Sequence, residues 1–138
     1  MLAIASSHDE IIRTAARLYN DRDVDGYVDR FSADAKLRTL LDGEVQGREA
    51  IRDWAQRQWE EVDSRFEVLD IEDSGERQAI VSAAFTVSTR GLEQRQALTF
   101  LFSFTGGEEK RIAAIGVFGT PAEASKAASR EADVAGRP

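Results

Sequence analysis

Large apolar side chains recur at every second position of residues 97–104, at Leu98, Phe100, Phe102 and Phe104. A period of two places all four on one face of a β-strand. Three further runs are also typical of strands: residues 65–71, 78–90 and 110–118. The pattern predicts a curved sheet with an aromatic inner wall in the second half of the chain.

The first half of the chain has helical periodicity instead. Apolar residues recur at intervals of three and four after a capping-box pair, Ser7 and Glu10, which predicts an amphipathic helix over residues 7–19. Asp23 is suited to cap a short second helix that ends near Phe31. A strand over residues 36–41 and a third helix over residues 48–62 follow. We expect these helices to close the concave side of the sheet.

Residues 1–120 form one domain in this interpretation, and residues 121–138 form a polar, alanine-rich tail. The tail begins with a second capping-box pattern around Pro121, but it has no stripe of large apolar residues. The sequence leaves two alternatives open for it, a frayed helix or a disordered segment.

Two of the predicted strands, residues 79–87 and 112–118, are apolar on both faces. A strand with one solvated face would carry polar residues at alternate positions. Because the helices are already used on the concave side, a second subunit is the simplest cover for the outer side. We therefore expect a homodimer that forms through the outer face of the sheet.

Composition excludes several classes of function. The net charge is −7 and cysteine is absent, which argues against a nucleic-acid or anionic-membrane partner and excludes thiol chemistry. No run of about 18 apolar residues is present, and the N-terminal run is too short for a signal peptide. The acidic group at residues 67–73 is expected to be a solvated strand end without a metal. A cytoplasmic protein with no cofactor is the expectation.

Three short motifs, DVDG at residues 23–26, FSADA at 31–35 and GREAI at 47–51, occur in this order between the predicted elements. With them the chain resembles the SnoaL-like and ketosteroid-isomerase-like branch of the nuclear transport factor 2-like superfamily. The resemblance covers residues 8–123. It implies an α+β fold, a cone-shaped barrel made of a strongly curved antiparallel sheet closed by N-terminal helices, with a ligand cavity at the open end and dimers through the outer sheet face.

The catalytic residues that this resemblance implies are missing. The base position of ketosteroid isomerase falls on Thr39, the helix-one phenol on Ala15 and the late-strand acid on Phe100. The one histidine, His8, precedes the first helical turns and is expected to lie on the surface. A His–Asp pair for cyclase chemistry is therefore not expected, and the catalytic residues, if there are any, are unknown.

We expect the cone to bind a small hydrophobic molecule, and the sequence leaves open whether a reaction is catalysed. An apolar wall with a few hydroxyl and indole groups is typical of a small-ligand site. The alternative is a filled cone in a module for oligomerisation or protein interaction, in which the same residues are simply core. By strand alternation and the resemblance, the residues expected to line the site are Tyr19, Thr39, Trp54, Phe85, Thr89, Phe100, Phe102 and Phe118.

Overall fold

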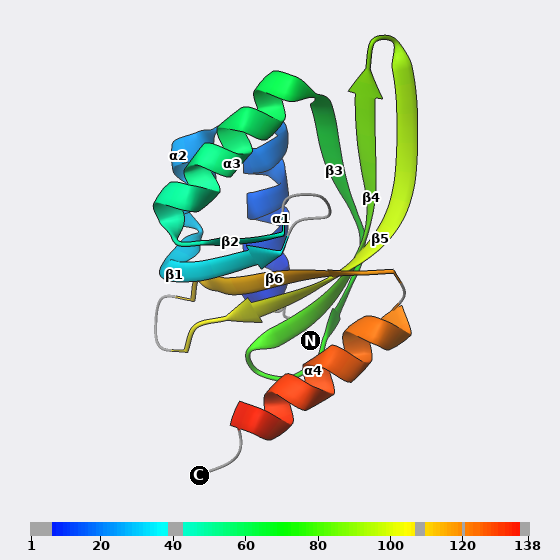
Figure 1. The fold of residues 1–138 in the computed structure, drawn as a ribbon. Helices are drawn as coiled ribbons and strands as arrows, with labels where there is room; N and C mark the ends of the chain where they lie inside the picture. The colour runs from blue at the N-terminus through cyan, green and yellow to red at the C-terminus, as the bar shows by residue number, and fades with distance from the viewer. Residues whose placement is uncertain (1–6, 39–42, 107–109, 120, 136–138) are drawn as a thin grey trace, which may run out of the picture.

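The computed structural model describes residues 7–38, 43–106, 110–119 and 121–135. Its helices are α1 (Ser7–Asn20), α2 (Val24–Asp29), α3 (Arg48–Glu61) and α4 (Pro121–Ala135). Its strands are β1 (Phe31–Arg38), β2 (Glu44–Gln46), β3 (Asp63–Asp73), β4 (Gln78–Thr89), β5 (Leu92–Phe104) and β6 (Ile112–Phe118). The six described strands form one curled sheet with α1–α3 on one side and α4 on the other (Figure 1).

The predicted α+β cone fold is confirmed, with one difference in strand direction. The strand order is β2-β1-β6-β5-β4-β3, and the described neighbours are antiparallel except β1 and β6, which are parallel. The sheet is therefore mixed and stays open at β2 and β3. Parallel neighbours need a long connection, and α3 with four strands lies between β1 and β6 in the chain. The spacing of apolar residues within one strand does not predict which distant strand will pair with it.

The inner face of the sheet follows the predicted alternation. Leu98, Phe100, Phe102 and Phe104 of β5 are all buried in the main core. Ala79, Val81 and Ala83 of β4 join them, and the stripe of α1 packs onto the same core through Ile12, Ala15 and Tyr19. The four β5 residues thus form the aromatic inner wall that the period of two predicts.

The expected inward direction of Phe118 is wrong. Phe100 pairs with Val117 across β5 and β6, and Val117 packs against the inner core, whereas Phe118 packs against Ile80 and Leu101 on the outer face. The register of β6 shifts between Ile112 and Ala114 against both neighbouring strands. The irregularity reverses the alternation, so a simple count from Ile112 places Gly116 and Phe118 on the wrong face.

Of the two alternatives for the tail, the structure has the helix over Pro121–Ala135. Ala124 and Ala128 of α4 are buried against Ile80, Leu101 and Phe118 of the outer sheet face. The contact stripe consists of alanines four residues apart. This spacing places them on one helix face. Because alanine is small, the sequence shows no stripe of large apolar residues at these positions. Helix α4 therefore covers part of the outer face that we expected a second subunit to cover.

The expected surface position of His8 is also wrong. The His8 ring is buried and stacks on Phe104, with centroids 4.4 Å apart and an interplanar angle of 5°. Its Nδ1 lies 3.1 Å from a carboxylate oxygen of Asp73, and its Nε2 lies 2.8 Å from the carbonyl oxygen of Glu76. Lys110 Nζ lies 3.4 Å from Nε2. These contacts join the start of α1 to the β3–β4 turn, more than 60 residues away, and no local pattern predicts them.

Replacing this ring tests its contribution to stability. His8→Ala should lower the free energy of unfolding by about 2 kcal/mol, because it removes a buried stacked ring and its hydrogen bonds. His8→Phe keeps the stacking on Phe104 and should lose about half as much. Urea denaturation followed by circular dichroism measures both. Wild-type stability in the alanine variant would show that the His8 contacts contribute nothing.

Candidate functional site

Five aromatic side chains meet at the end of α1, between α2, α3 and the sheet. Tyr19 is at the centre, and its ring centroid lies within 6.5 Å of four others. We call this group the aromatic cluster: Tyr19, Tyr27, Trp54, Trp59 and Phe85. Both tyrosines are buried, whereas the two tryptophans and Phe85 are half-buried and border the solvent. The cluster thus joins the core to the surface at this end of the fold.

The Tyr19 hydroxyl has a buried partner in Ser64 of β3. The two oxygen atoms are 2.8 Å apart, either can donate, and Ser64 is 1% exposed. Sequence reasoning missed Ser64 because the third strand was expected to begin at Arg65. Its inward position could have been predicted, because Ser64 lies two residues before Phe66 and therefore on the same face of the strand. This hydroxyl pair places a polar group inside an otherwise apolar cluster.

Burial controls the ionisation of both tyrosines. Burial raises the pKa of Tyr19 above its ordinary value, and the Ser64 hydroxyl, the Arg22 cation and the nearby Trp59 indole oppose that shift only in part. Burial also raises the pKa of Tyr27 well above its ordinary value, and the neighbouring Tyr19 adds to the effect. Tyr19 is therefore a neutral phenol at physiological pH and can donate a hydrogen bond.

The indole nitrogens of Trp54 and Trp59 are buried and make no hydrogen bond within the described part of the chain. The Trp59 nitrogen is near enough to the Tyr19 hydroxyl to affect its pKa, but the geometry is not that of a hydrogen bond. A buried donor without a partner costs about 1–3 kcal/mol. Such a group calls for an explanation, and an acceptor supplied by a ligand is one.

Arg22 places a positive charge beside the cluster. Its guanidinium carbon lies 5.9 Å from the centroid of the Trp59 ring, and it donates to the Ser64 carbonyl and the Asp63 carboxylate at 3.2 and 2.7 Å. Indole N–H groups and a guanidinium can only donate, and the two hydroxyls can do both. The polar groups of the cluster therefore favour a ligand that carries an acceptor.

The structure brings together only some of the expected site residues. Tyr19, Trp54 and Phe85 are in the cluster, while Phe100 and Phe102 are buried deeper in the same core. Thr89 is exposed at the end of β4, about 13 Å along the strand from Phe85. Phe118 lies on the other face of the sheet, and Thr39 lies outside the described residues.

The positions of the acidic and basic side chains limit the reactions that the aromatic cluster could catalyse. Ala15 and Phe100, where the ketosteroid isomerase resemblance would need a phenol and an acid, are buried apolar residues. A His–Asp pair does exist, contrary to expectation, but His8 is about 16 Å from Tyr19 along α1. Its two ring nitrogens already face Asp73 and Glu76. We therefore assign no general base to the aromatic cluster.

No group of three or more His, Cys, Asp or Glu side chains that could hold a metal ion occurs among the described residues. None of the helices in the same part of the chain is long and apolar enough to cross a membrane.

The comparison with known families agrees with the arrangement of elements. A family model, the SnoaL-like domain, matches residues 12–118. The chain belongs to the SnoaL-like domain family. No protein of curated function matches this SnoaL-like chain in sequence.

Solved structures share the fold at low sequence identity. A candidate polyketide cyclase from Sinorhizobium meliloti is 23% identical, with a TM-score of 0.67 over 79% of this chain and 94% of that chain. A ketosteroid isomerase-like protein from Erwinia carotovora atroseptica is 15% identical, with a TM-score of 0.64 over 79% and 90%. A protein from Mycobacterium tuberculosis is 10% identical, with a TM-score of 0.73 over 88% and 96%. At these identities the likeness establishes the fold alone.

Alkaline titration tests the burial of Tyr19 and Tyr27, the only two tyrosines of the chain. Both have a pKa above the ordinary value of 10.0 in the folded protein, whereas in the unfolded chain they titrate at about 10. As pH rises past that value, the unfolded chain loses protons that the folded chain keeps, so the free energy of unfolding falls.

Tyrosinate absorbance provides the measurement. At pH 10 the folded protein should show little tyrosinate, and the denatured protein should be about half ionised. Half ionisation of the folded protein at that pH would contradict the burial of these hydroxyls.

Proposed function

We propose that this SnoaL-like protein binds a small, mainly apolar molecule that carries a hydrogen-bond acceptor, at the aromatic cluster. The observation that carries the proposal is the pair of buried indole N–H groups, on Trp54 and Trp59, that have no partner among the described residues. A ligand oxygen would satisfy one or both of them and remove the cost of leaving them unpaired.

The surroundings of these donors narrow the class of ligand. Rings of Tyr19 and Phe85 offer apolar contact, and Trp54, Trp59 and Phe85 are half-buried at the border with solvent. The neighbouring Arg22 favours an oxygen with partial or full negative charge. A ketone, a quinone or an enolate on an aromatic or alicyclic body meets these requirements.

The names of the structural relatives fit this class. A polyketide and a ketosteroid are both apolar carbonyl compounds, and proteins named for them share the present fold. For this chain the proposal is limited to binding, because no general base is assigned to the cluster. A cyclase or isomerase reaction would need a proton acceptor that touches the bound molecule.

Two-dimensional amide NMR gives a specific test, since Trp54 and Trp59 are the only tryptophans and their indole N–H signals are separate from the rest. Acetylnaphthalene, which carries a carbonyl, should move at least one indole proton downfield and bind about tenfold more tightly than ethylnaphthalene of similar size. In Trp54→Phe, which keeps a ring but lacks the N–H, this preference should shrink.

Two results would contradict the proposal. Equal binding of the ketone and the hydrocarbon would exclude recognition of an acceptor. Failure of both compounds to shift either indole signal saturably would favour the alternative, a filled cone in an interaction module.

We also propose a homodimer through the part of the outer sheet face that α4 leaves open. Support comes from the outer face of β4 beyond Ile80, which α4 already covers, because Ala84 is apolar and faces the same side as Ile80. The half-buried Ser82 of the outer face would lie at the contact.

Light scattering coupled to size exclusion tests this assembly. The full chain should elute as a dimer at micromolar concentration, and Ser82→Arg should convert it to a monomer by placing a charge in the contact. Gln56→Arg, at an exposed position of α3, is the matched control and should stay dimeric. A monomeric full chain would contradict the proposed dimer.

A further inference from the structure

The β4–β5 hairpin extends beyond the rest of the sheet and leaves one edge of β5 without a neighbour. Every β4 residue from Gln78 to Thr89 pairs with β5, whereas β6 pairs with β5 only from Thr99 to Phe104 in the described part of the chain. Residues 92–97 of β5 are all exposed. Figure 1 shows this end of the hairpin projecting past β6. The sheet therefore has an open strand edge here, in addition to those of β2 and β3.

Two hydrogen bonds at the far end of β5 indicate which backbone groups face the open edge. The Phe104 N–H donates to the Arg77 carbonyl on the β4 side, and the Thr105 N–H donates to the Arg111 carbonyl on the β6 side. Successive residues of a strand direct their backbone groups to opposite neighbours, and the register of β4 and β5 has no shift. Within residues 92–97, even-numbered residues therefore bond β4, and the N–H and C=O groups of odd-numbered residues point to the open edge.

This open edge lacks the proline, lysine and bulges that protect many natural edge strands from pairing. Residues 92–97 read Leu-Glu-Gln-Arg-Gln-Ala, and no bulge interrupts their register with β4. A two-residue turn at Arg90 and Gly91, both with positive φ, closes the hairpin, as tight hairpin turns require. The hairpin end is therefore a regular ladder that can accept another extended strand.

The side chains along this edge match a second copy of the same segment. Glu93 and Arg95 lie on one face of β5. In an antiparallel pair with Gln94 at the two-fold axis, each Glu93 faces the partner's Arg95, and these two residues exchange both of their backbone hydrogen bonds. A shift of the register by two residues in either direction would place two glutamates or two arginines opposite each other. Charge therefore selects one register.

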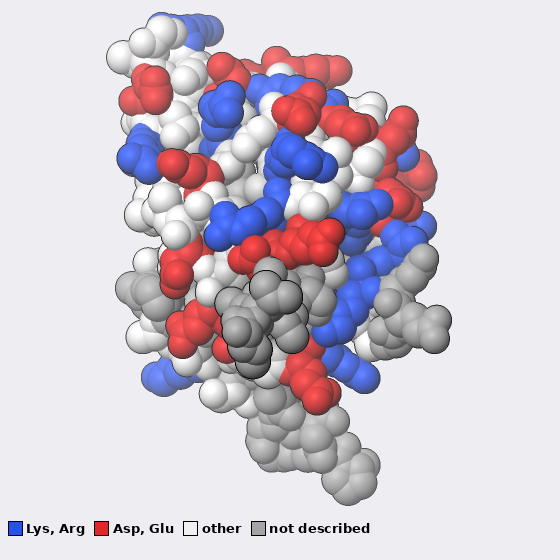
Figure 2. Space-filling view, turned by 180° about the vertical axis from the view of Figure 1, so that it is seen from behind, with Lys and Arg blue, Asp and Glu red and all other residues white. Residues whose placement is uncertain are grey.

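The charges on this edge are available for that pairing. The Arg95 guanidinium lies 2.8 Å from a carboxylate oxygen of Glu67, and both side chains are mostly exposed. A guanidinium has five N–H donors, so Arg95 can bind a second carboxylate while it keeps Glu67. Figure 2 shows acidic and basic side chains interspersed on the projecting end of the molecule (top left), with no extended area of one sign. This mixture suits another copy of the chain better than a strongly charged partner.

We propose that the open edge of β5 at residues 92–97 pairs with the same edge of a second copy, antiparallel and with Gln94 at the two-fold axis. Leu92, which is 75% exposed, then lies opposite the partner's Gln96. The contact is separate from the outer-face dimer, because it uses the edge of the sheet rather than its face. Six residues per strand make a small contact, so it should form at concentrations on the order of 1 mM and leave the micromolar assembly unchanged.

Amide NMR of the full chain at about 50 µM and about 1 mM tests the pairing. The Glu93 and Arg95 amide protons should move downfield as the concentration rises, because they exchange water for a carbonyl oxygen of the partner. The Gln94 amide already bonds β4 and should move much less, which makes the alternation an internal control.

Charge variants test the register. Glu93→Lys and Arg95→Glu each place like charges opposite each other, and each should weaken self-association at least about fivefold. A mixture of the two variants brings opposite charges together again and should restore the association. Glu60→Lys, at an exposed position of α3, is the matched control and should associate as the wild type does. Circular dichroism checks that the variants are folded.

Three outcomes would overturn the proposal. They are Glu93 and Arg95 amides that do not move at the higher concentration, single variants that associate as the wild type does, and no recovery in the mixture. The outer-face dimer is tested separately, since Ser82→Arg acts on it at micromolar concentration and leaves the edge of β5 intact.

Discussion

The contact between the last turn of α1 and the edge strand β3 determines where the aromatic cluster lies. Asn20 pairs with both backbone groups of Phe66, and Tyr19 bonds Ser64 in the next inward position of the strand. Arg22, just after the helix, bonds the Ser64 carbonyl and the Asp63 carboxylate. An edge strand exposes unpaired N–H and C=O groups, and here the side chains of Asn20 and Arg22 satisfy three of them.

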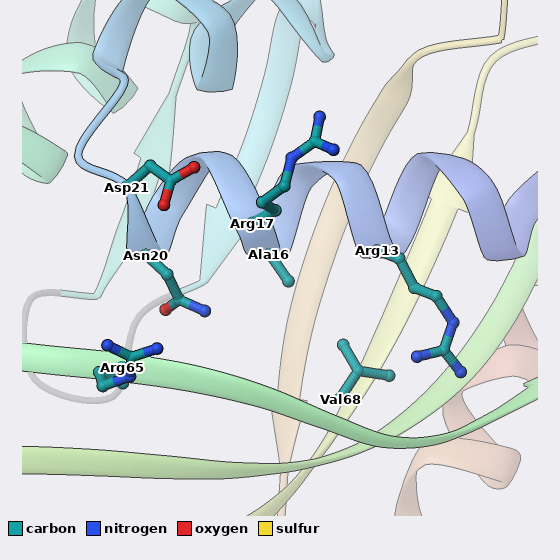
Figure 3. A pocket seen from close by; sticks show the side chains of 7 residues that line it. All are labelled: Arg13, Ala16, Arg17, Asn20, Asp21, Arg65 and Val68. Atoms are coloured by element: carbon teal, nitrogen blue, oxygen red, sulfur yellow. The ribbon is translucent and has the colours of Figure 1, made fainter.

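This contact gives the two sides of α1 different environments. Toward the core, Tyr19 packs against the rings of α2, α3 and the sheet, and this burial raises the pKa of its hydroxyl. Toward the solvent, the helix and strand separate at Ala16 and Val68, and arginines border the gap (Figure 3). The helix therefore borders the aromatic cluster on one side and an open pocket on the other.

The outer side of the sheet shows how small residues can cover an apolar face. Ala124 and Ala128 allow α4 to approach Ile80, Leu101 and Phe118 closely. The cover comes from the same chain, so an apolar outer face is not by itself evidence for a partner. The dimer proposed above depends on the part of this face that lies beyond α4.

Much of the core could be predicted because the rule behind it is local. The period of two in β5 and the stripe of α1 identified Phe100, Phe102 and Tyr19 as inward residues. The cap of α2 was also predictable, since Asp23 accepts from the Gly26 N–H three residues later. Where one irregularity in β6 changed the alternation, the same rule failed for Phe118.

The candidate site was less predictable than the core. Tyr19, Trp54 and Phe85 were found because ring size and helical or strand spacing mark them. Ser64 and His8 were missed, since their significance comes from partners 45 and 65 positions away.

The amino-acid sequence alone determined the α+β class, the aromatic wall and the absence of catalytic groups at two of the positions implied by ketosteroid isomerase. These properties follow from the period of side chains along one segment and from residue identity. The tertiary structure decided the burial of His8, the side of the sheet that Phe118 occupies, the partner of Tyr19 and the pocket beside α1. Each of these depends on which distant segments meet, and strand register and helix docking, rather than local periodicity, set those meetings.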